Sequence, residues 1–299
     1  MIRERLVYES IKRGYLWLKN WNGEEARKLE AEWIVEKSMY EAGMIKDISC
    51  YETRKKYIKD HTTDFSIPNK YGGKCGSVIY TSEASELYQN TKEGFQYLSW
   101  VLQNQAPDGS WKEIITEFFP KEKNWYYSTS FKYWVTATVL INIRWNCLDS
   151  YKSIRLALDF LDNKMISISD ALEKVKTKYL KEYLAFQELD IWTIAHLARV
   201  FYMYDEYDNC ELCYKIINIL SEDICCDNLD IQQNVANSML LNQYKLNNTL
   251  IHRIVENSLN AQHHTGGWGY QTNMDDVTLS AYIIKLMILY KKDFGNDEE

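Results

Sequence analysis

Hydrophobic residues along the chain recur mostly three and four positions apart, as on one face of an α-helix, and seldom alternate as in a strand. Only three prolines and twelve glycines interrupt this pattern. Because proline and glycine are the strongest breakers of regular structure, their scarcity favours long helices. The pattern predicts an all-α protein.

The expected helices are of two kinds. One kind is amphipathic, with an apolar stripe and a charged opposite face, and covers residues 150–161, 209–220 and 249–262. The other kind is almost free of charge around its circumference and covers residues 131–143, 191–204, 231–244 and 277–290. Since a helix without a charged face is covered on all sides, we expect the second kind to be inner helices and the first kind to be outer helices.

The alternation of outer and inner helices is periodic. Three inner helices open with similar phrases, "LDIWTIAHLA", "LDIQQNVANS" and "DDVTLSAYII", in which Asp190, Asp230 and Asp276 recur after 40 and 46 residues. Such intervals are typical of helix-pair repeats. Further helices are expected over residues 3–20, 24–42, 50–60 and 78–90, which gives about six pairs. We therefore predict one domain over residues 1–299, a single (α/α)6 barrel or toroid, with a more divergent N-terminal part over 1–75.

Composition narrows the classes of function. The net charge is −7 and Lys and Arg form no stripe, which argues against a nucleic-acid partner because phosphate binding needs clustered cations. The first residues carry charges throughout, unlike a signal peptide, and no segment has the length and apolarity of a membrane span. We expect a cytoplasmic protein with no transmembrane segment.

The seven cysteines do not form the even set of a secreted disulfide framework and are expected to be reduced thiols. Cys210 and Cys213 form a C-x2-C pair, followed by Cys225 and Cys226, a spacing that thiolates use to share zinc. The first pair falls within a helical pattern rather than a knuckle turn. We therefore predict no metal and no cofactor.

Two turns carry the most distinctive motif, "QNQAPDGSW" over 103–111 and "QHHTGGWG" over 262–269. They resemble the repeated Gln–Trp motif of the terpenoid cyclase and protein prenyltransferase superfamily, in which a Gln ends one helix, a Gly-rich turn follows and a Trp packs beneath the next helix. The matching residues are Gln103, Gly109 and Trp111, then Gln262, Gly267 and Trp268. Glycine reaches positive φ at low cost and Trp buries a large area, so both suit this turn. The resemblance implies an α/α toroid.

The second turn continues as "GGWGYQTNMDDVTLSAY", which is similar to squalene–hopene-type and class II diterpene cyclases. There an Asp-x-Asp-Asp-Thr-Ala opens an inner helix, and its middle Asp protonates the substrate alkene. Asp275 matches that proton donor, Asp276 its neighbour, and Asn273 the first position, which here lacks a carboxylate, while the Thr-Ala is displaced. The resemblance implies a terpenoid-cyclase-like enzyme that protonates an isoprenoid and cyclises the resulting carbocation, with Asp275, Asp276 and Asn273 at the catalytic position.

A carbocation needs aromatic faces around it, because their quadrupoles attract cations. The expected inner helices supply candidates for binding an isoprenoid or lipid, namely Tyr133, Trp134, Trp192, His196, Tyr202 and Tyr282.

Other interpretations stay open. An Asp at a helix start also caps the helix, and Asp276 shares its register with Asp190 and Asp230, which favours a cap. The toroid could be non-catalytic and bind a lipid, a peptide or a protein partner in its central cavity, as the amide-rich "IQQNVANSMLLNQY" suggests. It could also be a prenyltransferase-like subunit, for which Asp223 and Cys225 offer half of a zinc site, although 276–282 lacks the expected His.

Overall fold

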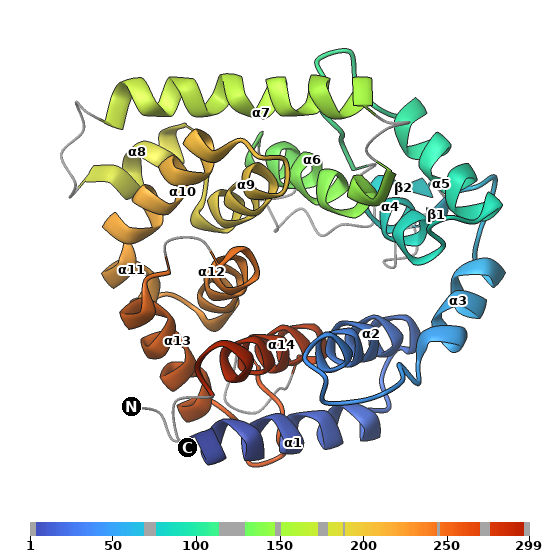
Figure 1. Cartoon of the computed structure of the whole chain (residues 1–299), viewed down its shortest axis with the longest axis vertical. Helices are drawn as coiled ribbons and strands as arrows, with labels where there is room; N and C mark the ends of the chain where they lie inside the picture. The colour runs from blue at the N-terminus through green and yellow to red at the C-terminus, as the bar shows by residue number, and fades with distance from the viewer. Residues whose placement is uncertain are drawn as a thin grey trace. The chain divides into compact units, whose positions relative to one another are not determined.

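A computed structural model describes most of the chain. The described ranges are 4–68, 76–113, 129–146, 151–172, 179–187, 189–243, 246–269 and 276–295. Within them the protein is mostly helical, with fourteen α-helices and a short 3-10 turn, η2 (Arg144–Asn146). Strands β1 (Ile67–Pro68) and β2 (Gly76–Ser77) pair antiparallel, with Ile67 opposite Ser77. The predicted helical class is confirmed at this level (Figure 1).

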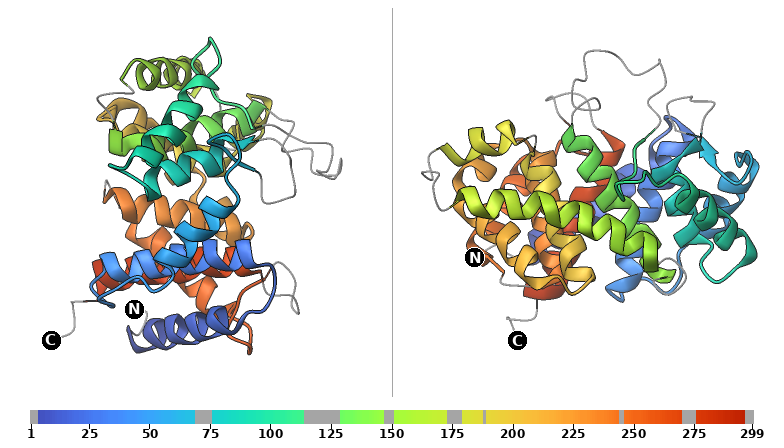
Figure 2. Two further views of the ribbon diagram at one scale, coloured as in Figure 1. Left: turned by 90° about the vertical axis from the view of Figure 1, so that its right-hand side faces the viewer. Right: turned by 90° about the horizontal axis from the view of Figure 1, so that it is seen from above.

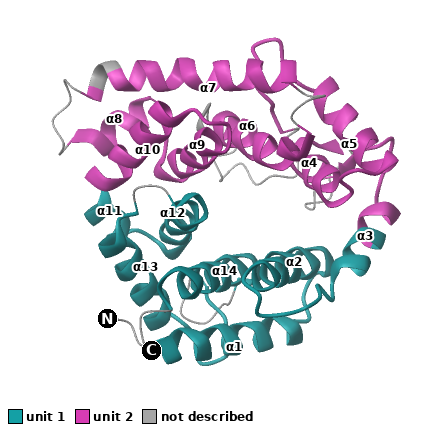
Figure 3. Cartoon of the chain, in the orientation of Figure 1, with its two compact units in different colours: residues 1–56, 220–299 teal, residues 57–219 magenta. Residues whose placement is uncertain are grey.

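The chain divides into two compact units, residues 1–56 with 220–299 and residues 57–219 (Figure 3). Unit 1 combines N-terminal and C-terminal segments of the sequence. Its helices are α1 (Glu4–Asn20), α2 (Glu25–Glu41), the start of α3 (Tyr51–Asp60), α11 (Ser221–Cys226), α12 (Leu229–Asn242), α13 (Asn248–Asn260) and α14 (Val277–Phe294). Here α14 packs against α1, α2 and α12, and α12 packs against α13, contacts that Figure 2 shows from two further directions.

Unit 2 contains the middle of the chain. Its helices are the end of α3, then α4 (Val78–Leu87), α5 (Lys92–Gln103), α6 (Thr129–Ile143), α7 (Tyr151–Leu172), α8 (Leu180–Phe186), α9 (Ile191–Met203) and α10 (Tyr207–Ile219). Helix α4 packs against α5 and α6, α6 packs against α9, and α9 packs against α10. Helices α4, α6 and α9 therefore form a contiguous inner row.

The two expected kinds of helix differ in burial, but the inner kind is not covered on all sides as expected, because Trp192, His196 and Arg199 of α9 are partly exposed. Of two helices that each have 13 residues, α9 buries eight and α13 buries five along one stripe. The outer helix expected over 150–161 is longer than predicted, because α7 continues to Leu172. The added residues bury Met165 and Ile168, so the helical apolar spacing persists. Within the described ranges, no helix combines the length and apolarity needed to cross a bilayer.

Candidate functional site

The two Gln–Trp turns have the same internal hydrogen bonds. In the second turn, the Gln262 amide group donates to the Gly266 carbonyl at 2.8 Å, and in the first turn Gln105 donates to the Gly109 carbonyl at 2.8 Å. The predicted match of Gln103 with Gln262 was therefore wrong by two residues. Gln103 is exposed, and its side-chain amide donates to Ser99 Oγ one turn earlier in the same helix at 3.1 Å.

The glycine register also changes. Gly109 and Gly266 both have positive φ, 88° and 107°, so Gly109 corresponds to Gly266 and not to Gly267 as predicted. A Cβ on Gly266 would lie 2.7 Å from the Arg13 carbonyl, and one on Gly109 would collide with the Leu156 carbonyl. Both positions therefore need glycine for backbone conformation and for close packing on a neighbouring helix.

The tryptophan of each turn is fully buried and joins two helices. In the first turn, Trp111 Nε1 donates to the Val101 carbonyl of α5 at 2.8 Å, and its backbone amide donates to Thr136 Oγ1 of α6 at 3.1 Å. The second turn repeats this arrangement. Trp268 Nε1 donates to the Ser258 carbonyl at 2.7 Å, and its amide donates to Ser280 Oγ at 2.8 Å. The prediction that each Trp packs between neighbouring helices and holds them together is confirmed.

Each glutamine also reaches a further helix. Gln105 donates to the Ser153 carbonyl of α7 at 2.8 Å, the outer helix that comes next in the chain after α6. Gln262 donates to the Ser10 carbonyl of α1 at 3.1 Å and accepts from Ser10 Oγ at 2.9 Å. In unit 1, therefore, α1 occupies the place relative to the second turn that α7 occupies relative to the first.

The aspartates at the starts of inner helices do not share one register. Asp190 caps α9 by accepting from the Thr193 amide at 2.6 Å, and Asp276 caps α14 by accepting from the Leu279 amide at 2.8 Å. Asp230 lies inside the first turn of α12, whose cap is Asn228, so the predicted equivalence fails at this helix. Local competition between two cap-forming residues explains the shift.

The proposed catalytic group is described only at Asp276. Its Oδ1 makes the cap bond, and its Oδ2 accepts from Arg27 Nη2 of α2 at 2.8 Å. Both oxygens thus act as acceptors, which supports the interpretation as a cap. Asn273 and Asp275 lie outside the described residues.

The structure brings three predicted substrate-binding residues together in unit 2. Trp134 Nε1 of α6 donates to His196 Nε2 of α9 at 3.2 Å, and the Trp192 and His196 rings stack with centroids 5.9 Å apart. An indole N–H can only donate, so Nε2 is the acceptor and the His196 proton resides on Nδ1, 3.1 Å from the Trp192 carbonyl. These three residues form an aromatic cluster with a neutral imidazole at its centre.

The other three predicted binding residues lie elsewhere. Tyr133 stacks on Phe160 of the outer helix α7 with centroids 5.0 Å apart, so its ring does not join the aromatic cluster. Tyr202 meets Tyr207 of α10 edge to face. Tyr282 belongs to α14 in unit 1, where its carbonyl accepts from Asn237 Nδ2 at 3.1 Å.

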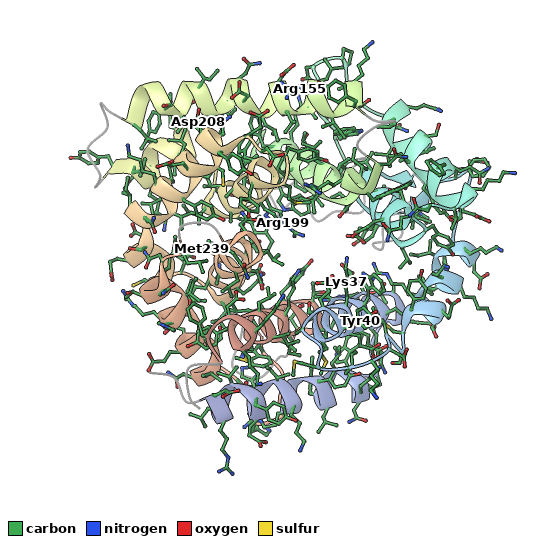
Figure 4. The ribbon with its side chains drawn as sticks, viewed as in Figure 1. Lys37, Tyr40, Arg155, Arg199, Asp208 and Met239 are labelled. Carbon is green, nitrogen blue, oxygen red and sulfur yellow. The ribbon has the colours of Figure 1, made fainter. Side chains whose placement is uncertain are left out.

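Inner helices keep one partly exposed stripe at helical spacing. The stripe of α9 consists of Trp192, His196 and Arg199, and that of α14 consists of Thr278, Tyr282 and Lys285. Figure 4 draws these side chains and labels Arg199, together with Lys37 on the partly exposed face of α2. Each unit by itself thus has a stripe in which an aromatic ring lies near a cation, which suits a ligand that combines an apolar body with an anionic group.

Sequence reasoning missed a buried carboxyl, Glu113, two residues after Trp111. Glu113 is 8% exposed, and its Oε2 accepts from the Ile79 amide of α4 at 3.3 Å. Burial raises the pKa of the Glu113 carboxyl to about 7, against hydrogen bonds from Ser77 and from the amides of Ile79 and Val78 that lower it. The surrounding sequence, "SWKEI", contains no recognisable motif for a buried acid. The one signal of burial is that Glu113 follows the conspicuous Trp111 by two residues.

A second buried carboxyl, Glu36 in unit 1, has the opposite character. It accepts from Lys19 Nζ at 2.6 Å, Tyr15 OH at 2.9 Å, Ser49 Oγ at 2.8 Å and the Cys50 amide at 3.0 Å. Burial alone would raise the pKa of Glu36, but these hydrogen bonds outweigh it and lower the pKa to about 2. Because these donors lie on α1 and just before α3, Glu36 ties α2 to both segments and acts as a structural anion.

The cysteines offer no assembled metal site in the described ranges, where no three His, Cys, Asp or Glu side chains come together. Cys210, Cys213 and Cys225 are buried and Cys226 is exposed. Burial raises the pKa values of the Cys213 and Cys225 thiols, which disfavours the thiolate that binds metal.

No protein-family model matches the chain, and no curated protein matches it. The residues and geometry described above are therefore the basis for a functional proposal.

Proposed function

We propose that this protein is a terpenoid-cyclase-like enzyme built as a single (α/α)6 toroid, which binds an isoprenoid against its inner helices and cyclises it after protonating an alkene. The observation that carries the proposal is the cluster of Trp134, Trp192 and His196. It places two indole rings and an uncharged imidazole on neighbouring inner helices. Such a surface stabilises a carbocation without offering it a charged nucleophile.

Two observations support the toroid. The two Gln–Trp turns repeat one set of hydrogen bonds, as expected of helix-pair repeats. Moreover, Gln262 bonds to α1 as Gln105 bonds to the outer helix that follows its own repeat. In a closed ring of helix pairs, the first outer helix lies next to the last pair, which here means α1 next to α13 and α14. The resemblance of both turns to the terpenoid cyclase motif agrees with this arrangement.

The proton for this reaction comes from a carboxyl near the start of an inner helix. The resemblance assigns it to Asp275, with Asn273 and Asp276 to orient it. Since both oxygens of Asp276 are engaged as acceptors, Asp276 positions the start of α14 and does not transfer the proton.

The test is incubation of the purified protein with linear isoprenoids of several lengths, followed by mass spectrometry of extracted products. Replacing Trp192 by Leu removes one aromatic face, and a cation–π contribution of about 0.5–2 kcal/mol corresponds to a loss of roughly 2- to 30-fold in rate. The matched control is Tyr133→Leu, since that ring stacks on Phe160 and is expected to leave the rate unchanged. An absence of cyclic products from every isoprenoid would refute the proposal.

A second candidate is a non-catalytic toroid that binds an amphiphilic lipid or a peptide. The partly exposed stripes favour it, because Arg199 and Lys285 add cations next to aromatic residues. A lipid that co-purifies with the protein and is lost on Arg199→Gln would support binding, provided that isoprenoids remain unconverted.

A further inference from the structure

Glu113 has a rigid position at the amino end of the inner helix α4. It follows Trp111, which is held by hydrogen bonds to Thr136 and Val101. Its Oε2 accepts from the Ile79 amide at 3.3 Å. The carboxyl is therefore fixed between α4 and the first Gln–Trp turn.

One oxygen of this carboxyl is unused. Oε1 of Glu113 is buried and has no hydrogen-bond partner within the described ranges. The groups there that act on the carboxyl are the Ser77 hydroxyl and the amides of Val78 and Ile79, none of which is charged. A buried carboxylate without a cation is costly, so the neutral acid is favoured, with its proton on Oε1.

Neither the helix nor the turn requires a carboxyl at this position. Ser77 already caps α4, because its Oγ accepts from the Tyr80 amide at 3.1 Å. The second turn has Tyr270 two residues after Trp268, where the first has Glu113 two residues after its Trp. A buried acid that opposes stability and is not needed by the fold is typical of a functional group.

The acid belongs to the same inner row as the aromatic cluster. Helix α4 packs against α6, which carries Trp134, and α6 packs against α9, which carries Trp192 and His196. On α6, one turn after Trp134, Thr138 Oγ1 is a second buried oxygen without a hydrogen-bond partner in the described chain. Unpartnered polar atoms thus occur beside the start of α4 and on the adjacent helix α6.

We propose that Glu113, in place of the Asp275 that the resemblance implies, is the proton donor to a bound isoprenoid alkene, an inference that rests on the proposed function. The O–H bond at Oε1 breaks and leaves its electron pair on the carboxylate. The π electron pair of the alkene forms a new C–H bond, and the other alkene carbon becomes the cation. After ring closure, a proton leaves the carbon next to the final cation and returns to the carboxylate. The product is an isomer of the substrate, and neither oxidant nor reductant is needed.

The test measures Glu113→Gln in the isoprenoid assay, with Glu93→Gln, which changes an exposed carboxyl of α5, as the matched control. A general acid contributes roughly 10²- to 10⁴-fold, so Glu113→Gln is expected to lose at least about 100-fold in rate, whereas Glu93→Gln keeps the wild-type rate. The wild-type rate is expected to fall as pH rises through about 7, because the donor must be protonated. Activity retained by Glu113→Gln, an equal loss in Glu93→Gln, or a rate that is constant through this window would overturn the assignment.

Infrared spectroscopy separates this inference from the proposed function. If the wild type converts no isoprenoid, the proposed function fails, and the difference spectrum between wild type and Glu113→Gln decides whether the acid exists. A carbonyl band of a protonated carboxyl that disappears as pH rises through about 7, and that the variant lacks, would support Glu113 as a stored proton. Absence of that band would overturn the inference whatever the activity.

Discussion

Replacing Glu113 by Gln is expected to change how the stability of the protein depends on pH. In the folded state the pKa of Glu113 is raised from 4.5 to about 7 by burial. Between these values the unfolded chain is ionised while the folded protein still holds the proton, so wild-type stability falls as pH rises. At about 1.4 kcal/mol for each pH unit, the wild type loses about 3 kcal/mol across this window. Gln cannot ionise and avoids that loss.

The assay is urea unfolding of wild type and Glu113→Gln at about pH 4 and about pH 8, below and above the window in which the carboxyl titrates. The difference in unfolding free energy between the two proteins is expected to move by about 3 kcal/mol in favour of the variant between these conditions. Any constant effect of the substitution on packing or hydrogen bonding cancels in this comparison. Parallel pH dependence of the two proteins would show that Glu113 is ionised when folded and would refute the reasoning.

Three further substitutions test the structure. Glu36→Gln is expected to lower the free energy of unfolding by about 3 kcal/mol near neutral pH. In urea unfolding at several pH values, the variant is also expected to lack the loss of stability that the wild type shows as pH falls from 4.5 to about 2. Gln105→Ala leaves two carbonyls without their donor and is expected to cost about 1–3 kcal/mol, whereas the exposed control Gln103→Ala stays within about 0.5 kcal/mol; equal losses would contradict the corrected register. Gly266→Ala forces positive φ and a close approach to the Arg13 carbonyl, so we expect a loss of about 1–3 kcal/mol in thermal unfolding, and a neutral outcome would argue against the turn geometry.

The helices and their inner or outer character could be predicted because both follow from local apolar spacing. A helix such as α9 shows in its own sequence that most of its surface is buried, although Trp192, His196 and Arg199 stay partly exposed. The caps at Asp190 and Asp276 could be predicted for the same reason, since a cap bonds to an amide three residues away. The prediction that Asp230 caps α12 was wrong because Asn228, two residues earlier, caps this helix instead. The local sequence allows either residue as the cap.

The glutamine of the first turn could have been placed from the sequence. Gln105 precedes Trp111 by six residues, as Gln262 precedes Trp268, whereas Gln103 precedes Trp111 by eight. The sequence did not give the partner of this glutamine, the Ser153 carbonyl, which lies 48 residues further along the chain. That hydrogen bond joins segments that local spacing does not relate to one another.

By itself, the sequence determined the helical class, the positions of most helices and the residues that fasten the two turns, because all of these depend on spacing within a few residues. The tertiary structure decided the protonation states of the two buried carboxyls. Glu36 accepts from donors on α1 and in the turn before α3, which lower its pKa to about 2, whereas Glu113 meets only uncharged groups at the start of α4 and burial raises its pKa to about 7. A carboxyl responds to its surroundings in space, and in a folded chain those surroundings come from residues that are distant in sequence.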